Sequence, residues 1–439
     1  MALTNPPSRD EKANWSVKIN LPHKNLKELQ EKKLRRHKAI STCKNELSLA
    51  KWYSKFIILS FRACGACIIN VHQGKTYRFR VHNVGISTSL NFRIEGHNLL
   101  LVETEGRYTS QQNFTSFDIH VGQSYSFLVT MDQNATKDYY IVASARFVNE
   151  SVWQRVTGVG VLHYSNSKGP VTGPLPCKIQ QQVELGRTPK GLFHYGSINV
   201  TETYVIRSLP PFRINGKRLA TLNGISFVNP DTQIRLADLH HVKGAYKLDF
   251  PSKPHDTTPK MDRSIINATY RGFVEVIFQN NDTKIQSFHM DGYAFYVVGM
   301  DFGLWTESSR SSYNKWDAIS RSTTEVYPGG WTAVLISLDN VGVWNLRVEN
   351  LDRWYLGRET YMRIVNPEEN GKTELPPPDN VLYCGALKSL QKYVMYPKPI
   401  LYQNLSASLP TTNGRRSCFA ENDSVLQQWH CTVVTPTCF

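Results

Sequence analysis

The stretch Thr76-Tyr-Arg-Phe-Arg-Val81 alternates apolar and polar side chains, which is typical of a β-strand with one face in a core. Ser116-Phe-Asp-Ile-His-Val121 repeats this pattern, and turns rich in Gly or Asn separate such runs. The other alternating or apolar runs cover residues 124–130, 139–147, 199–206, 272–279, 294–298, 331–337 and 361–365. Because no long helical pattern separates them, the sequence predicts an all-β chain of tandem β-sandwiches.

A linker rich in Pro and Gly, Lys168-Gly-Pro-Val-Thr-Gly-Pro-Leu-Pro176, divides these runs into two blocks. We therefore expect one β domain over residues 72–170 and a second over 193–400, joined by a linker over 171–192. The tail over 401–439 is polar and irregular.

The first 71 residues differ from the rest of the chain in charge. They hold fourteen Lys and Arg against five Asp and Glu, so they account for nine of the fifteen net positive charges. Residues 23–60 are rich in Lys, Leu and Glu, which favours one or two basic helices. A nucleic acid or an anionic membrane is a weaker alternative partner for this segment, because no nucleic-acid-binding motif accompanies the charge.

Targeting signals are not evident in the chain. No run of eighteen apolar residues occurs, so we expect no membrane span. Residues 1–20 have no apolar core after their charges, and a chain that truly starts at Met1 would be expected in the cytoplasm.

Potential N-glycosylation sites indicate secretion instead of a cytoplasmic location. Asn-x-Ser/Thr sequons are dense, and several lie between strand-like runs, where a surface glycan would fit. This pattern favours a secreted glycoprotein. Those expected to carry glycans are Asn113, Asn134, Asn149, Asn199, Asn267, Asn281 and Asn404.

The run Asn340-Val-Gly-Val-Trp-Asn-Leu-Arg-Val-Glu-Asn-Leu-Asp-Arg-Trp-Tyr-Leu-Gly357 resembles the copper-ligand segment of ascorbate oxidases and laccases. In those enzymes it reads N-x-G-x-W-x-x-H-C-H, followed by another His and an axial Met or Leu. A blue-copper site needs a thiolate and two imidazoles, whereas a guanidinium has no lone pair to donate. The resemblance places Arg347, Val348 and Glu349 at the His-Cys-His positions, Arg353 at the next His and Arg358 at the axial residue.

The body of the chain, from Gly74 to about Asn404, resembles the plant multicopper-oxidase-like proteins of the skewed-growth group. These are also labelled L-ascorbate oxidase homologues or monocopper oxidase-like proteins. The resemblance implies Greek-key cupredoxin-like domains, the second and third of three, in a secreted cell-wall glycoprotein. The segment over 1–71 is expected to be unlike the family, so the first domain would be absent. The segments that carry the resemblance are Tyr77-Arg-Phe-Arg-Val-His-Asn-Val-Gly85, Ala220-Thr-Leu-Asn-Gly-Ile-Ser-Phe-Val-Asn-Pro230, Ser287-Phe-His-Met-Asp-Gly292 and Tyr327-Pro-Gly-Gly-Trp-Thr-Ala333.

A second oxidase segment, H-P-W-H-L-H-G, aligns with residues 286–292 and keeps one His of three. Gln286 then replaces a ligand of the mononuclear copper and Asp291 a ligand of the copper cluster. His289 is expected to be an ordinary hydrogen-bonded histidine. No cofactor is predicted from the residues themselves, and copper enters only through the family analogy.

The charges at these positions admit two interpretations. Arg347 and Glu349 lie two apart on a strand and could join Asp352 and Arg353 in an ion-pair network. Alternatively, all four are solvated.

The cysteines give little support for a metal or redox site. Cys64 and Cys67 have the spacing of such a site, but no second pair follows at a suitable distance. Cys384 matches a family cysteine whose disulfide partner lies in the first domain. It is therefore expected to be an orphan thiol or to pair with Cys64 or Cys67.

The resemblance implies a non-catalytic cell-wall protein that acts in cell expansion, root growth or pollen-tube growth. Cell-wall polysaccharide is the candidate partner, although no residue spacing demonstrates carbohydrate binding. The alternative function is a copper-dependent oxidoreductase of the ascorbate oxidase or laccase type.

Overall fold

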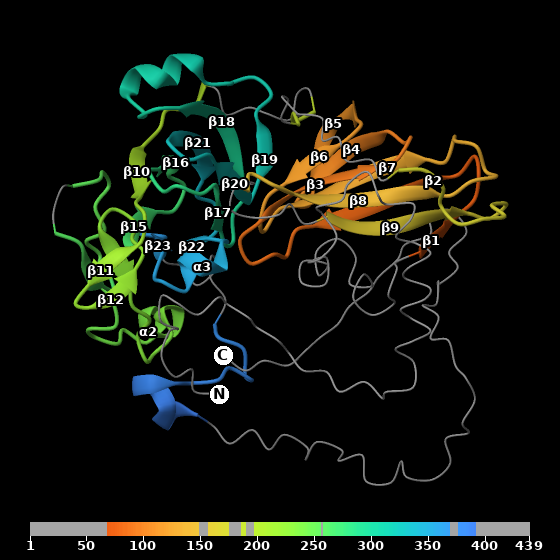
Figure 1. The fold of residues 1–439 in the computed structure, drawn as a ribbon. Helices are drawn as coiled ribbons and strands as arrows, with labels where there is room; N and C mark the ends of the chain where they lie inside the picture. Colours follow the sequence, from red (N-terminus) through yellow and green to blue (C-terminus); the bar gives the residue numbers. More distant parts are fainter. Residues whose placement is uncertain are drawn as a thin grey trace, which may run out of the picture.

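The computed structural model describes residues 68–148, 157–174, 186–189, 197–255, 258–368 and 376–391. These residues form two β-sandwiches that lie side by side, which confirms the predicted all-β class (Figure 1). Each strand-like run of the sequence overlaps an observed strand. The predicted helices over 23–60 and the tail over 401–439 lie outside the described residues.

The first sandwich consists of a five-stranded and a four-stranded sheet. Across the first sheet the strands are β1 (Ile68–Val71), β9 (Thr157–Tyr164), β8 (Tyr139–Arg146), β3 (Ser89–Ile94) and β6 (Phe117–Ile119). Across the second they are β2 (Thr76–His82), β7 (Ser124–Thr130), β4 (Leu99–Thr104) and β5 (Arg107–Phe114). Strand β1 pairs in parallel with β9, so the first sheet begins four residues before the expected domain start at residue 72.

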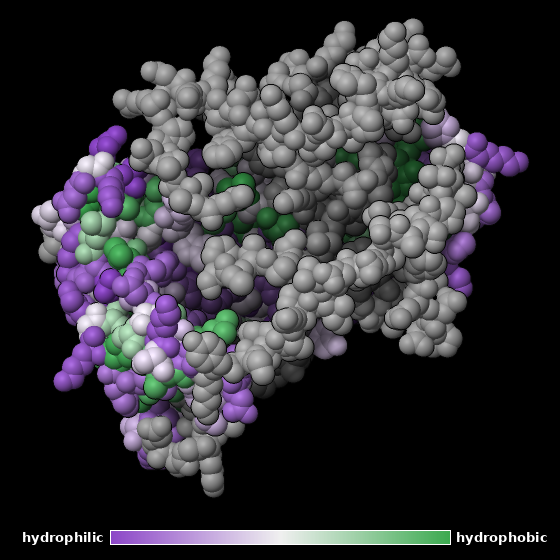
Figure 2. Space-filling model, turned by 90° about the horizontal axis from the view of Figure 1, so that it is seen from below, coloured by the Kyte–Doolittle hydropathy of each residue, from purple (hydrophilic) through white to green (hydrophobic). Residues whose placement is uncertain are grey.

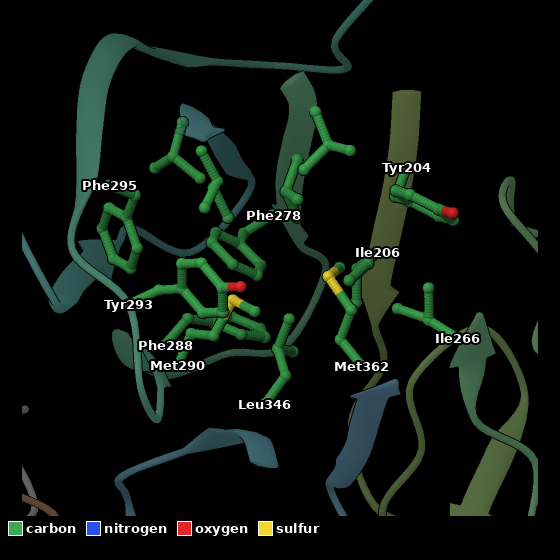
Figure 3. Close-up of a cluster of buried hydrophobic side chains, with 14 of the residues drawn as sticks. Tyr204, Ile206, Ile266, Phe278, Phe288, Met290, Tyr293, Phe295, Leu346 and Met362 are labelled. Carbon is green, nitrogen blue, oxygen red and sulfur yellow. The ribbon is translucent and has the colours of Figure 1, made fainter. Parts of the chain in front are cut away.

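The second sandwich consists of two five-stranded sheets. One contains β10 (Glu202–Ser208), β16 (Phe273–Asn280), β21 (Gly330–Ser337), β18 (Phe295–Phe302) and β19 (Ile319–Arg321). The other contains β15 (Ile266–Thr269), β23 (Glu359–Val365), β22 (Gly342–Val348), β17 (Gln286–Met290) and β20 (Thr323–Val326). Both inner faces contribute apolar side chains to one core (Figure 3). At its centre the rings of Phe278 and Phe288 stack with centroids 4.4 Å apart.

Short strands, helices and 3-10 turns lie outside the two sheets of the second sandwich. They are the strand pairs β11 (Phe212–Ile214) with β12 (Lys217–Leu219) and β13 (Ile225–Phe227) with β14 (Lys260–Asp262), the helices α2 (Ile234–Leu239) and α3 (Leu351–Trp354), and the 3-10 turns η4 (Glu307–Ser312) and η5 (Gly385–Leu390).

The β4–β5 hairpin of the first sandwich contacts the second sandwich. Glu105 and Gly106 both have positive φ, 48° and 83°, as a tight two-residue β-turn requires. The Glu105 carboxylate therefore projects from the β4–β5 turn and accepts hydrogen bonds from the backbone N–H groups of Ser322 (2.6 Å) and Thr323 (2.9 Å). These contacts fix the start of β20 against the first sandwich.

Candidate functional site

Strand β22 carries the segment that resembles a copper-ligand sequence. Because side chains alternate along a strand, Leu346 and Val348 point into the core, where each is 0% exposed. Arg347 lies on the opposite face and is partly buried. Val348, at the position that the resemblance assigns to the cysteine ligand, is thus a core residue.

Arg347 is the centre of a cluster of charged and polar side chains. Its guanidinium forms ion pairs with Glu349 (2.8 Å) and Asp291 (2.9 Å). It also lies over the ring of Trp354, 4.7 Å from the centroid, which adds a cation–π contact. Of the ion-pair network predicted for these charges, the pair between Arg347 and Glu349 therefore forms.

His289 joins this cluster through Asp291. Its Nε2 lies 3.0 Å from the Asp291 carboxylate, and its Nδ1 lies 2.8 Å from the Thr323 hydroxyl. Burial raises the pKa of Asp291, but the hydrogen bonds from His289 and Arg347 outweigh it and hold the pKa below its usual value. His289 is a hydrogen-bonded histidine with both ring nitrogens engaged.

A second, more deeply buried cluster surrounds Asp282. Arg353 donates from Nε to its carboxylate at 2.7 Å, and Arg358 donates from Nη1 at 2.8 Å. The side chains of Asp282 and Arg358 are both 0% exposed. Arg358 also donates to the backbone carbonyl of Leu209. Each buried charge therefore meets an opposite charge, as burial requires.

The predicted four-residue network is corrected by this arrangement. Arg353 and Asp352 pair with each other at 2.9 Å, but Arg353 reaches Asp282 and not Glu349, which pairs with Arg347. The reason is that the chain changes direction after β22. There the side-chain Oδ1 of Asn350 accepts a hydrogen bond from the backbone N–H of Ser287, and α3 begins. Sequence reasoning missed Asp282, which no motif marks.

Gln286 is 1% exposed and donates from Nε2 to the Asn280 side chain at 3.1 Å. Its Oε1 meets no hydrogen-bond partner among the described residues. It points away from the Arg347 cluster, since alternate residues of β17 face opposite sides and His289 lies on the other face.

A pocket of about 290 Å³ lies where Glu349 meets the first sandwich. Gly122 makes this approach possible, because a Cβ there would lie 2.5 Å from Cγ of Glu349. The lining residues are His82, Asn83, Val84, Gly85, Val121, Gly122, Gln123, Ser124 and Glu349. The pocket is thus shared by both sandwiches.

Five of the predicted glycosylation positions are described, and all five are exposed: Asn113, Asn134, Asn199, Asn267 and Asn281. Asn149 and Asn404 lie outside the described residues. Cys384 is an exposed free cysteine, whereas the other seven cysteines, including Cys64 and Cys67, fall outside the described ranges.

The described residues contain no group of three or more His, Cys, Asp or Glu side chains arranged to hold a metal ion. They also contain no helix that is long and apolar enough to cross a membrane. Seen from below, the coloured surface is mostly hydrophilic, with several separate hydrophobic spots (Figure 2).

Comparison with known proteins places this geometry in a family. Two multicopper oxidase family models match residues 23–167 and 231–370. The first match begins at residue 23, inside the segment over 1–71.

The chain is 72% identical over 342 residues to "Monocopper oxidase-like protein SKS1" of Arabidopsis thaliana, covering 74% of this chain and 58% of that protein. It is 65% identical to "Monocopper oxidase-like protein SKU5" of the same plant, with the same coverage. It is 27% identical to the L-ascorbate oxidase of Cucurbita maxima, covering 74% and 60%. The chain therefore spans somewhat more than half the length of these relatives.

Among solved structures, the multicopper oxidase Fet3p matches with a TM-score of 0.56 and 18% identity, over 68% of this chain and 57% of that one. At this identity the match shows the fold alone. Taken with the sequence relatives and the family models, it leads to one assignment: this chain is a member of the multicopper oxidase family.

Proposed function

We propose that this chain is a non-catalytic member of the family that acts in the plant cell wall. It would bind wall polysaccharide during cell expansion, root growth or pollen-tube growth. The observation that carries the proposal is the ion-pair cluster of Arg347, Glu349 and Asp291. The sequence resemblance assigns these three positions to copper ligands.

The chemistry of the side chains present does not fit copper. A blue-copper site takes a cysteine thiolate and two imidazoles, but the aligned positions hold a valine and charged residues. Arg347 and Arg358 bring fixed positive charges and no lone pairs, so each would repel the ion. His289 has both ring nitrogens in hydrogen bonds to Thr323 and Asp291.

Secretion is part of the same proposal. Asn113, Asn134, Asn199, Asn267 and Asn281 are all exposed, as glycan attachment requires. A glycosidase-dependent shift in the mobility of the protein, expressed in plant cells, would support it. Recovery of the unglycosylated protein from the cytosol alone would contradict it.

A copper-dependent oxidoreductase of the ascorbate oxidase or laccase type is the second candidate. Family membership favours it, since relatives with about 27% identity carry the name L-ascorbate oxidase. It needs ligands that the described residues do not supply.

The deciding experiment measures copper content and oxygen uptake on the same purified chain. The protein is incubated with Cu²⁺, dialysed and analysed by atomic absorption, and oxygen consumption is then followed with ascorbate and with a phenol. We expect substoichiometric copper and no oxygen uptake above that of buffer. One or more copper ions per chain, together with oxygen uptake, would reject the non-catalytic assignment. The L-ascorbate oxidase of Cucurbita maxima is the positive control.

A further inference from the structure

Three aromatic rings from the two sandwiches form a continuous strip, here called the aromatic strip: Phe147, Tyr327 and Phe302. Tyr327 is central, with its ring centroid 5.5 Å from that of Phe147 and 6.3 Å from that of Phe302. The outer rings are open to solvent, since Phe147 is 47% and Phe302 71% exposed. The strip therefore crosses the junction between the sandwiches.

The strip is not explained by core packing. Phe147 follows β8 and has φ of 54°, a left-handed conformation that is an outlier for a bulky residue. Such backbone strain costs on the order of 1 kcal/mol and is concentrated at functional sites. Here it accompanies a large apolar ring that stays partly in water. Folding alone would favour a smaller or polar residue at this position.

The charges beside Phe147 are already compensated. The Arg146 guanidinium lies over the Phe147 ring, 4.6 Å from its centroid, but also pairs with Asp118 at 3.0 Å. His120 stacks on Phe147, and burial lowers its pKa, which keeps the imidazole neutral. The surface around Phe147 thus combines an apolar ring with hydrogen-bonding groups whose charges are balanced, and among the described residues it offers no unpaired cation.

We propose that the aromatic strip binds a neutral glycan chain. This inference rests on the proposed polysaccharide-binding function and names its site. The C–H faces of pyranose rings are apolar and flat, so they can stack on the Phe302 ring and pack against the exposed part of Phe147, while sugar hydroxyls bond to the Arg146–Asp118 pair. The amphipathic surface required is the one that aromatic side chains with polar neighbours provide.

The balanced charges decide between ligand classes. An acidic polysaccharide or a nucleic acid draws its affinity from cations that lack a partner, and Arg146 has its partner in Asp118. A stable protein partner needs a contact area of about 800 Å² per side, far more than three rings supply. A neutral, linear glycan fits the strip best.

The test is affinity electrophoresis of the full chain in native gels that contain hydroxyethyl cellulose, a neutral β-glucan. Wild type should be retarded. Phe302→Ala and Phe147→Ala should each weaken binding by about two- to tenfold, the range for one aromatic contact. Tyr355→Ala is the matched control, because Tyr355 is 74% exposed and lies outside the strip. It should migrate like wild type.

Several outcomes would overturn the inference. The inference fails if hydroxyethyl cellulose does not retard the wild type, or if it retards both Phe variants as strongly as the wild type. Retention by polygalacturonate that neither Phe substitution changes would also reject the strip, but it would leave polysaccharide binding intact. The copper and oxygen measurements judge the non-catalytic assignment separately. Unchanged melting temperatures exclude misfolding as the cause, and Phe302→Ala is the safer variant because its ring is the more exposed.

Discussion

Asp282→Asn tests whether the buried triad of Arg353, Asp282 and Arg358 stabilises the second sandwich. The substitution preserves side-chain volume but removes the negative charge between two guanidinium groups, which lie 2.7 Å and 2.8 Å from the carboxylate. Breaking a buried ion pair costs about 3–5 kcal/mol, because an uncompensated charge is left behind. With two arginines affected, we expect a loss at the upper end of this range in the free energy of unfolding.

The pH dependence gives an independent measure of the same interaction. Burial raises the pKa of Asp282, but the hydrogen bonds and charges of Arg353 and Arg358 lower it to about 2. A depression of nearly two pKa units corresponds to about 2.5 kcal/mol of stability. Because the folded pKa is the lower one, this stability is present above pH 4 and is lost as the pH falls towards 2.

The assay is urea unfolding at pH 7 and pH 3, followed by tryptophan fluorescence, since Trp344 and Trp354 lie in this sandwich. Asp317→Asn is the control, because Asp317 forms an exposed pair with Arg187 at 3.2 Å, and such pairs contribute less than about 1 kcal/mol. The difference between wild type and Asp282→Asn should be large at pH 7 and smaller at pH 3. The reasoning is refuted if Asp282→Asn is no more destabilising than Asp317→Asn at pH 7.

Three further predictions use thermal unfolding as the measurement. Glu349→Ala should lower the melting temperature, at a cost of about 1–2 kcal/mol, because Arg347 loses a partly buried partner; an unchanged value would show that the pair is solvated. Glu325→Gln should cost about 3 kcal/mol, since Arg321 and Glu325 are 2% and 4% exposed and Gln123 of the first sandwich bonds to the same carboxylate; a loss similar to that of exposed Glu307→Gln would argue against it. Gly292→Ala should be more harmful than Gly106→Ala, because both have positive φ but only at residue 292 would the new Cβ meet the Trp344 ring, at 2.3 Å; equal losses would mean that backbone strain alone matters.

The sequence by itself determined the strands, because alternation is a local property. Thr76–Val81 was predicted as a strand, and β2 covers Thr76–His82. The apolar and polar positions of such a segment decide which face can be buried, whatever the rest of the chain does. The sequence also determined which residues stand at the positions that the resemblance assigns to copper ligands, since chemical identity needs no structure.

Only the tertiary structure decided which charges meet. Asp282 precedes Arg353 by 71 residues, and no local pattern connects them. Arg353 and Glu349 are close in sequence, yet α3 turns the chain so that their partners differ.

The aromatic strip required even longer connections. Phe147 belongs to the first sandwich, whereas Tyr327 and Phe302 belong to the second. Their contact depends on how the two sandwiches are held together by Glu105 and its neighbours. Pairings of this kind arise from packing between distant segments, which a periodicity within one segment does not encode.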